Sequence, residues 1–343
     1  MVARDTAAAP APPGSTGVSD RKPRRPPPRR RQGRRVGTAL AVAAPWSWFV
    51  VRDWGDLADA AAIGLPVVTV AALGLLLFVA LVARPIRRAS LLSAASVLAV
   101  GLVAVVAPWT PERAPAPTSP VRVTAANVFL ENPRPAEAAA SILAQDAGVV
   151  ISIETGAQIR AVLDAAYPYA ASTGDGDGLA EVIHARWPIT GAGPLQGDLA
   201  PYGLRAVVER PEGRLVVYAV HLPRPWFDNT RYSQTLTVHR ALVAQLHDLV
   251  EKEVLPTVVG GDLNLVDRTS GYRQLDASLR DAVRSEWTGP TSLKRRLRFL
   301  LGRIDHIFVT DEWCARDGAR YTVPGSDHRA VTAAVGPCQA PGR

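Results

Sequence analysis

Six short motifs contain the residue types that chemistry on a phosphate requires, and each lies where an apolar run begins or ends. They are Asn127 in VRVTAANVF, Glu154 in VVISIE, His221 in LVVYAVH, Asp262 and Asn264 in VVGGDLN, Asp305 in RIDHIFV, and Asp327 with His328 in GSDHRAV. Carboxylate, amide and imidazole groups gathered in this way suit a hard divalent cation and a general base. A single such residue is more often a turn former. The six motifs in this order therefore carry more weight than any one of them.

The elements that must position these residues form one α/β domain. Short β-branched runs separated by Gly, Pro and Asp predict strands, and longer stretches with helical periodicity predict helices. We expect strands at 121–129, 149–154, 179–184, 204–209, 215–221, 257–261, 304–310 and 330–335, and helices at 135–145, 157–166, 232–253 and 271–277. About 220 residues of this pattern can enclose a sizeable core.

The order of the motifs resembles the endonuclease/exonuclease/phosphatase superfamily, which includes DNase I-like nucleases, AP endonucleases, inositol-phosphate 5-phosphatases and bacterial sphingomyelinases. The resemblance runs from Val121 to Val335. It implies a four-layer α-β-β-α sandwich of two packed mixed sheets in a catalytic domain spanning 121–337. It also implies a Mg²⁺-dependent phosphoric ester or anhydride hydrolase, with Mn²⁺ as the alternative cofactor.

The same resemblance implies a role for each motif residue. On the metal side it places Glu154, the principal Mg²⁺ ligand, with Asn127 and Asp327. It makes His328 the catalytic base and Asp305 the partner of that base. It also implies that His221 contacts the phosphoryl oxygens, and that Asp262 and Asn264 orient the water and hold the phosphate. The segment 185–189 is similar to the family's Ser-Arg-x-Pro-Ile strand end, but has Ala185 in place of Ser. Glu181 is the nearest candidate for an acidic partner of His221.

This residue set meets the two demands of phosphate hydrolysis, which are to neutralise the phosphate and to activate water near neutral pH. Mg²⁺ on Glu154 would polarise a phosphoryl oxygen. His328, held in one tautomer by Asp305, would remove the proton from water. Asn264 and His221 would donate to oxygens that gain charge in the transition state. The donors are mostly oxygens, without a His/Cys cluster, which favours Mg²⁺ over Zn²⁺.

The amino-terminal third has a different composition, and it predicts a membrane protein. The chain is 48% hydrophobic and 20% charged. Three uncharged segments, at about 36–51, 60–83 and 89–109, make up most of the region 37–109. We expect three transmembrane helices, since about 20 apolar residues span a bilayer. A Pro-rich linker at 110–120 then leads to the catalytic domain.

The charges near these segments predict their orientation. Residues 1–36 contain ten Lys and Arg against two Asp, which accounts for the whole formal charge of +8, and the Pro/Ala/Arg-rich sequence there predicts a disordered tail. The RPIRR loop at 84–88 is also basic, whereas the loop at 52–56 is not. The positive-inside rule therefore predicts a multi-pass cell-membrane protein with a cytoplasmic N-terminus and an extracytoplasmic catalytic domain.

The charge balance also bears on the substrate. From Thr110 onward the chain has 25 basic and 26 acidic residues, and a near-neutral domain disfavours nucleic acid as a partner. We expect the membrane and a lipid-linked phosphate, such as a prenyl pyrophosphate, as partners, and infer no protein partner. An extracellular nuclease or a sphingomyelinase-like phosphodiesterase is the alternative. The non-enzymatic alternative is an inactive domain of this family that only binds a ligand.

A narrower resemblance adds a physiological expectation. Three amino-terminal helices followed by this domain resemble the membrane-bound actinobacterial VanJ-like proteins associated with glycopeptide (teicoplanin) resistance. The resemblance implies a role in cell-envelope lipid metabolism.

Two further features leave alternatives open. The basic segment 294–301 either lies on lipid headgroups, binds a second phosphate, or is a solvated loop. Cys314 and Cys338 either form a disulfide or remain two buried thiols, because spacing alone does not decide whether they meet.

Overall fold

The computed structural model describes residues 28–174, 180–225, 234–294 and 298–339, and of residues 28–31 it describes the backbone. The catalytic domain contains two six-stranded mixed sheets. The first has the order β11 (Trp313–Thr322), β12 (Arg329–Pro337), β1 (Val121–Asn127), β2 (Val149–Ile153), β4 (Val182–Ala185) and β3 (Tyr169–Ser172). The second has the order β5 (Ile189–Pro194), β6 (Gly203–Arg210), β7 (Gly213–His221), β8 (Thr257–Asp262), β10 (Asp305–Thr310) and β9 (Leu279–Asp281).

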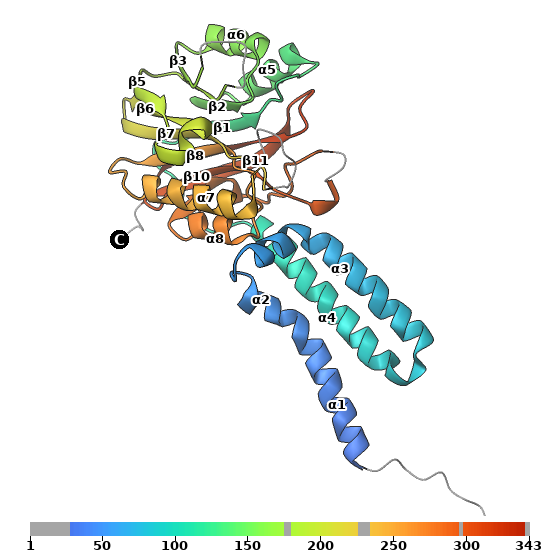
Figure 1. Cartoon of the computed structure of the whole chain (residues 1–343). Coiled ribbons are helices and arrows are strands. Elements are labelled where there is room, and N and C mark those ends of the chain that lie inside the picture. The colour runs from blue at the N-terminus through green and yellow to red at the C-terminus, as the bar shows by residue number, and fades with distance from the viewer. Residues whose placement is uncertain (1–27, 175–179, 226–233, 295–297, 340–343) are drawn as a thin grey trace, which may run out of the picture.

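Four helices complete the layers. Helices α5 (Pro135–Leu143) and α6 (Ala157–Ala166) lie on the first sheet, and α7 (Leu236–Val250) and α8 (Ser270–Asp276) lie on the second (Figure 1). A third apolar cluster, which includes Ile151, Val217 and Ile307, fills the space between the sheets. The prediction of two packed mixed sheets with flanking helices is therefore confirmed.

The sheets approach each other closely at the site end of β8. A Cβ on Gly260 would lie 2.6 Å from Cδ1 of Ile151 in the other sheet. Gly261 has a φ of 136°, and a Cβ there would lie 2.1 Å from the carbonyl oxygen of Val220. The two glycines of VVGGD thus let β8 pass close to its neighbours.

Strands β3, β5, β9 and β11 were not predicted, because their sequences lack the pattern of a half-buried strand. β9 has three residues, and β5 (ITGAGP) is largely exposed. β11 (WCARDGARYT) is interrupted by a register shift between Arg316 and Ala319. Strands at the edge of a sheet bury less surface, so their sequences carry a weaker periodic signal.

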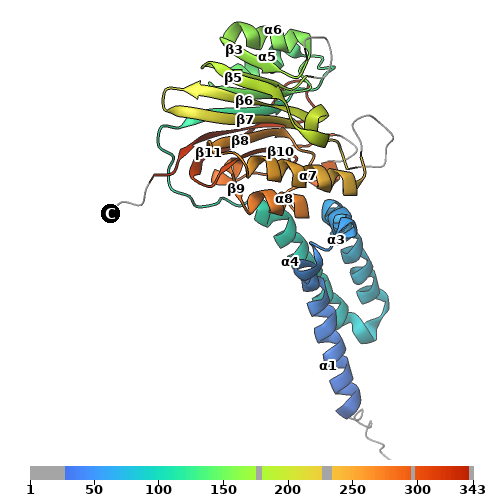
Figure 2. The same cartoon turned by 60° about the vertical axis from the view of Figure 1, so that its left-hand side comes forward.

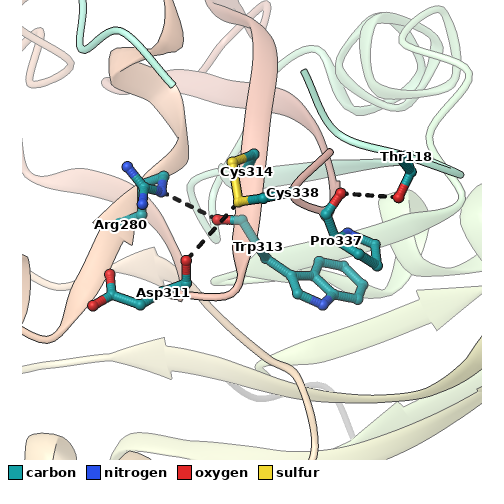
Figure 3. Close-up of a disulfide and its surroundings, with 7 residues drawn as sticks. All are labelled: Thr118, Arg280, Asp311, Trp313, Cys314, Pro337 and Cys338. Atoms are coloured by element: carbon teal, nitrogen blue, oxygen red, sulfur yellow. Dashed lines mark hydrogen bonds between the residues drawn. A yellow bond between two sulfur atoms is a disulfide. The ribbon is translucent and has the colours of Figure 1, made fainter. Parts of the chain in front are cut away.

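Cys314 and Cys338 form a disulfide (Figure 3). Cys314 lies in β11, opposite Gly336 of β12, and Cys338 follows β12 directly. The bond therefore fastens the end of the chain's last strand to its neighbour. The end of β12 is also bound by the segment before β1, because Thr118 donates from its backbone N–H and its hydroxyl to the carbonyl oxygen of Pro337 at 2.8 and 3.0 Å.

Two of the described helices are long and apolar enough to cross a membrane. They are α3 (Asp56–Val82) and the segment Arg84–Trp109, which consists of η2 (Arg84–Ile86), α4 (Arg87–Val106) and η3 (Ala107–Trp109). Both project from one end of the catalytic domain (Figures 1 and 2). A core helix would be mostly buried, whereas 11% of the most apolar window of α3 is buried.

The predicted first span differs from an uninterrupted apolar helix. Helix α1 runs from Pro28 to Ala43 and is followed by the 3-10 turn η1 (Ala44–Ser47) and the short α2 (Trp48–Val51). Residues 28–36, assigned to the disordered tail, form the first turns of α1, while 1–27 lie outside the described residues. Ser96 of α4 donates to the carbonyl oxygen of Val42 in α1 at 2.6 Å and accepts from Nε1 of Trp46 in η1 at 3.0 Å. The structure supports two spans, and the third stays a prediction.

The catalytic domain is bound directly to these helices. Asp59 of α3 accepts from the backbone N–H and the hydroxyl of Ser270 at 2.7 and 2.6 Å, and so caps α8. Arg240 of α7 pairs with Asp56 at 2.7 Å. Trp109 donates from Nε1 to Asp267 at 2.8 Å. The segment expected to be a linker also contacts the domain, since Glu112 forms an ion pair with Arg284 at 2.6 Å.

Candidate active site

The predicted site residues lie at one edge of the two sheets. β1 runs parallel to β2, and β7 runs parallel to β8, so their carboxyl ends lie together. Asn127, His221 and Asp262 end β1, β7 and β8, and Glu154 directly follows β2. β10 is antiparallel to β8, and its first residue, Asp305, lies opposite Asp262.

Asn127 holds two carboxylates together. Its Nδ2 donates to Glu154 Oε1 and to Asp262 Oδ2, both at 3.0 Å. Its Oδ1 accepts from the backbone N–H of Phe129 at 3.0 Å, which fixes this orientation of the amide. The other carboxylate oxygen of Glu154 accepts from the backbone N–H of Leu130 at 3.3 Å. Asn127 therefore presents its Nδ2 donor to both carboxylates, and its role as a metal ligand stays a prediction.

His328 and Asp305 form the predicted pair. The Nδ1 of His328 lies 3.0 Å from Asp305 Oδ2, and both side chains are buried. Thr291 Oγ1 accepts from the backbone N–H of Asp305 at 3.1 Å and so fixes the start of β10. The Nε2 of His328 faces the carboxylates, 3.7 Å from Asp262 Oδ2.

His221 lies among three carboxylates. Its Nε2 is 3.7 Å from Glu154 Oε1 and 3.8 Å from Asp262 Oδ2. On the other side of the ring, Nδ1 is 3.7 Å from Glu181 Oε1. Thr173 donates to the second oxygen of Glu181 at 2.7 Å and positions it. The structure therefore places Glu181 where a partner of His221 was expected.

Two site residues have unusual backbone angles. Glu154 has a φ of 55° and Asn264 a φ of 46°. Non-glycine residues in this left-handed region cost on the order of 1 kcal/mol each, and such residues concentrate at functional sites. The backbone N–H of Asn264 bonds Asp262 Oδ1 at 3.0 Å, and its Nδ2 donates to the carbonyl oxygen of Leu222 at 2.9 Å.

Asp327 lies beside Lys294 and His328. Its carboxylate is 3.5 Å from Lys294 Nζ and 3.8 Å from His328 Nε2, and its side chain is 30% exposed. The residue that shares Asn127 with Glu154 is Asp262. Asp262 therefore lies beside Glu154, and the metal-side role of Asp327 stays a prediction.

The carboxylates govern the titration of both histidines. Burial disfavours the charged ring of His328, but the negative charges of Asp305 and Asp262 raise its pKa to about 10. Burial likewise opposes protonation of His221, while the neighbouring carboxylates of Glu181 and Asp262 raise its pKa. Burial works against the charged form of Asp262 as well, yet the two histidines lower its pKa. The pocket therefore contains an excess of negative charge that protons compensate.

This excess and the donor types fit a divalent cation. Glu154 and Asp262 direct oxygens to the same Asn127 Nδ2, and oxygen-rich sets of this kind suit Mg²⁺. Asp262, Asp305 and His328 also lie close enough to share an ion. Because Asp305 already holds His328 Nδ1, we assign Glu154 and Asp262 as the residues that would hold the cation.

The remaining histidines of the domain do not join the cluster. His184 Nε2 lies 2.8 Å from Asp164, and His239 Nε2 lies 3.0 Å from the carbonyl oxygen of Leu263. His306 points away from its neighbour Asp305 and contacts the carbonyl oxygen of Leu265 at 2.7 Å. His247 lies on α7 near Glu251.

Supporting residues were missed because their types are common. Thr291 and Thr173 act through hydroxyls. Ser326 does so too, donating to the carbonyl oxygen of Asn127 at 2.7 Å and accepting from the backbone N–H of His328 at 3.0 Å. The only signal for Ser326 was its place in the Ser-Asp-His motif.

Residues 125–328, more than half of the chain, match the model of the endonuclease/exonuclease/phosphatase family. The chain belongs to this family. No curated protein was found to match the chain.

Solved structures share the fold of this family domain. An endonuclease/exonuclease/phosphatase from Bacteroides vulgatus is 16% identical with a TM-score of 0.52, covering 64% of this chain and 100% of the other. D. rerio TDP2 complexed with a single-strand DNA product is 13% identical with a TM-score of 0.51, covering 64% and 99%. An AP endonuclease from Archaeoglobus fulgidus is 15% identical with a TM-score of 0.50, covering 62% and 98%. At such identities the similarity shows the fold.

The geometry of this family site suits attack of water on a phosphate. A divalent cation bound here would neutralise phosphate charge and polarise a phosphoryl oxygen. Asp305 holds Nδ1 of His328, so that Nε2 faces the pocket and can accept the proton of water. A cation held by Asp262 would also lower the pKa of His328 and so favour its base form. His221 can donate to a phosphoryl oxygen through the ring nitrogen that faces Glu154.

Proposed function

We propose that this protein is a membrane-anchored, metal-dependent phosphoesterase that acts outside the cytoplasm on a lipid-linked phosphate. The preferred substrate class is a prenyl pyrophosphate or another envelope lipid phosphate. The family membership supports a phosphoesterase or nuclease. The lipid substrate rests on the location of the site.

The observation that carries the proposal is the loop after β8. Asn264 lies at the site, and Ser270 at the other end of this loop bonds Asp59 of α3. Six residues reach at most about 20 Å when fully extended. The loop therefore holds the pocket next to the end of an apolar helix.

The length of α3 supports a site at the membrane surface. Its 27 residues rise about 40 Å, whereas the hydrocarbon core is about 30 Å thick. The first two turns, with Asp56 and Asp59, form ion pairs with Arg240. We place these turns above the bilayer, so that the uncharged remainder from Ala60 spans it.

The orientation of the membrane helices is part of the proposal. The basic loop at 84–88 and the basic tail favour the cytoplasmic side. A reporter fused after Arg343 should be active only if it works outside the cell. Activity of a cytoplasmic reporter instead would contradict an extracytoplasmic site.

A nuclease or sphingomyelinase-like phosphodiesterase is the second candidate. It is favoured by the fold shared with an AP endonuclease and with TDP2 bound to DNA. The balance of 25 basic and 26 acidic residues from Thr110 onward disfavours nucleic acid.

A substrate panel tests the proposal. Full-length protein in detergent with Mg²⁺ should release phosphate from a prenyl pyrophosphate faster than it hydrolyses a phospholipid, sphingomyelin or DNA. The Glu154→Gln variant controls for contaminating phosphatases. Faster turnover of DNA than of any lipid would replace this proposal with the nuclease.

The proposal extends to glycopeptide resistance through the sequence resemblance alone. Expression of the wild-type protein in a sensitive host should raise the teicoplanin concentration needed to stop growth. The Glu154→Gln variant should not. Equal effects of the two proteins would exclude a role that depends on hydrolysis.

A further inference from the structure

A groove connects the catalytic pocket with the membrane helix α3. It is narrow, with a free volume of about 40 Å³, and its lining includes Asn264 of the site and Ile63 of α3. Lys294, which lies 3.5 Å from Asp327, and Arg224, two residues after the Leu222 that bonds Asn264, belong to the catalytic end. This end is therefore polar and cationic.

The other end is apolar and is fastened to α3. Ile63, Val266 and Leu300 line it. The guanidinium of Arg268 donates to the carbonyl oxygens of Ile63 at 3.0 Å and of Leu301 at 3.2 Å, and it also bonds that of Leu300. The two walls are thus held together by one buried side chain, at the level where the uncharged part of α3 begins.

An apolar stripe continues from the groove along α3. Ile63, Val67 and Val70 are spaced i, i+4 and i+7, so they share one face of the helix. Val67 is 44% exposed and Val70 is 70% exposed. In a bilayer the exposed side chains of Val67 and Val70 would face hydrocarbon.

We propose that the groove binds the hydrocarbon chain of a lipid phosphate or pyrophosphate next to its headgroup. The inference rests on the proposed function for the headgroup and adds the binding site of the tail. The reacting phosphate lies at Asn264, a second phosphate lies against Arg224 and Lys294, and the chain passes Leu300 and Ile63 to reach the stripe on α3. Burying methylenes against these side chains favours a long chain.

The charge and polarity along the groove select this occupant. A nucleic acid would place a polar sugar and a further phosphate against Val266, Leu300 and Ile63, where they find no polar partner among the side chains named. A polar group buried in this way costs free energy. A soluble phosphate monoester would leave the apolar end unused.

Protection of an introduced thiol tests the tail site without turnover. In Leu300→Cys the native cysteines stay in their disulfide, so a maleimide reports on position 300. A non-hydrolysable long-chain prenyl phosphonate should slow labelling at least fivefold, and a short-chain phosphonate less than twofold. Phe299→Cys is the matched control. Phe299 is next to Leu300 in the chain but is 58% exposed, so a cysteine at position 299 should be labelled equally fast with either ligand. Equal labelling with both ligands would overturn the inference.

A bulky side chain tests the same site during turnover. Leu300→Trp should lower the ratio of kcat/KM for a long-chain substrate to that for a short-chain one at least tenfold, whereas Phe299→Trp should keep the ratio. An unchanged ratio in Leu300→Trp would overturn the tail site even if the lipid is hydrolysed. Protection of Leu300→Cys without hydrolysis of any lipid would support the tail site and contradict the proposed reaction.

Discussion

The side chain of Arg268 in the catalytic domain donates from Nε to the backbone carbonyl oxygen of Ala62 in α3, at 2.6 Å. This carbonyl has no helical partner four residues on, because residue 66 is proline and has no N–H. A proline in α3 therefore creates the acceptor that the catalytic domain binds.

Removing this guanidinium should loosen the domain from the helices. Arg268 is 3% exposed, so Arg268→Met leaves the buried Ala62 carbonyl unpaired, removes the bonds to Leu300 and Leu301, and should cost about 3 kcal/mol of stability. Thermal unfolding in detergent measures the loss. Arg316→Met, at an exposed position of β11, should change stability by less than about 0.5 kcal/mol.

A double-mutant cycle with Pro66→Ala tests the cause. Residue 66 then offers an N–H to Ala62, so Arg268→Met should cost about 1 kcal/mol less in that background. Additive effects of the two substitutions would contradict a link through the Ala62 carbonyl.

His328→Ala should abolish most activity if this residue is the base. Its Nε2 faces the carboxylates of the pocket, and loss of a general base lowers kcat by about 10²–10⁴-fold. His247→Ala, on the outer side of α7, should keep wild-type kcat. More than about a tenth of the activity in His328→Ala would exclude it as the base.

Removing divalent cations should stop turnover and raise the pKa of His328. EDTA should abolish activity, and Mg²⁺ or Mn²⁺ should restore it. Without the cation, Asp305 and Asp262 raise the pKa of His328 to about 10, and positive charge beside Asp262 opposes this effect. An NMR titration of the His328 ring should therefore show a lower pKa with Mg²⁺. Full activity in EDTA would contradict the metal assignment.

Asp276 should make the protein less stable as pH rises from about 4 to 6. Burial, with the charge of Asp281, raises the pKa of Asp276 to about 6 from an ordinary value of 3.8. The folded protein holds this proton more tightly, so its stabilising contribution is complete below the unfolded pKa and is lost as pH passes the folded one.

Asp276→Asn should therefore stabilise the protein at pH 7.5 by about 2 kcal/mol and have little effect at pH 4. Thermal unfolding at both pH values measures the difference. Asp248→Asn, at an exposed position of α7, should show no such pH dependence. Equal stability of Asp276→Asn and wild type at pH 7.5 would contradict the raised pKa.

The Cys314–Cys338 disulfide should account for both cysteines. In denaturant, thiol titration should find no free thiol without reductant and two with it. Cys314→Ser should lower stability by about 3 kcal/mol, because the bond closes a loop of 24 residues. Equal thiol counts under both conditions would show that the bond does not form.

Much of the site was predictable because each functional side chain is tied to the end of a strand. Asn127 and Asp262 end runs of β-branched residues, and the carboxyl ends of parallel strands meet at one edge. The local sequence therefore predicted the ends of these two strands to within one or two residues. The edge strands β5 and β11 lack that pattern, so the local sequence did not predict them.

The role of each residue within the pocket was less predictable than the set of residues that form the pocket. The family resemblance places Asp327 on the metal side, and the structure adds that Asp262 is bound to Asn127 beside Glu154. Which carboxylate faces which neighbour depends on the register between β8 and β10 and on the packing of the two sheets. Neither leaves a local signature.

The sequence by itself determined which segments are apolar, where strands end in polar groups, and which family motifs are present, because hydrophobic periodicity and turn chemistry act between residues close in the chain. Only the tertiary structure decided that Arg268 meets Ala62 across 206 positions, that Cys314 meets Cys338, and that Ile63 and Asn264 share one groove. These contacts join surfaces of different elements. Their partners are chosen by how whole sheets and helices pack, and no spacing along the chain encodes that choice.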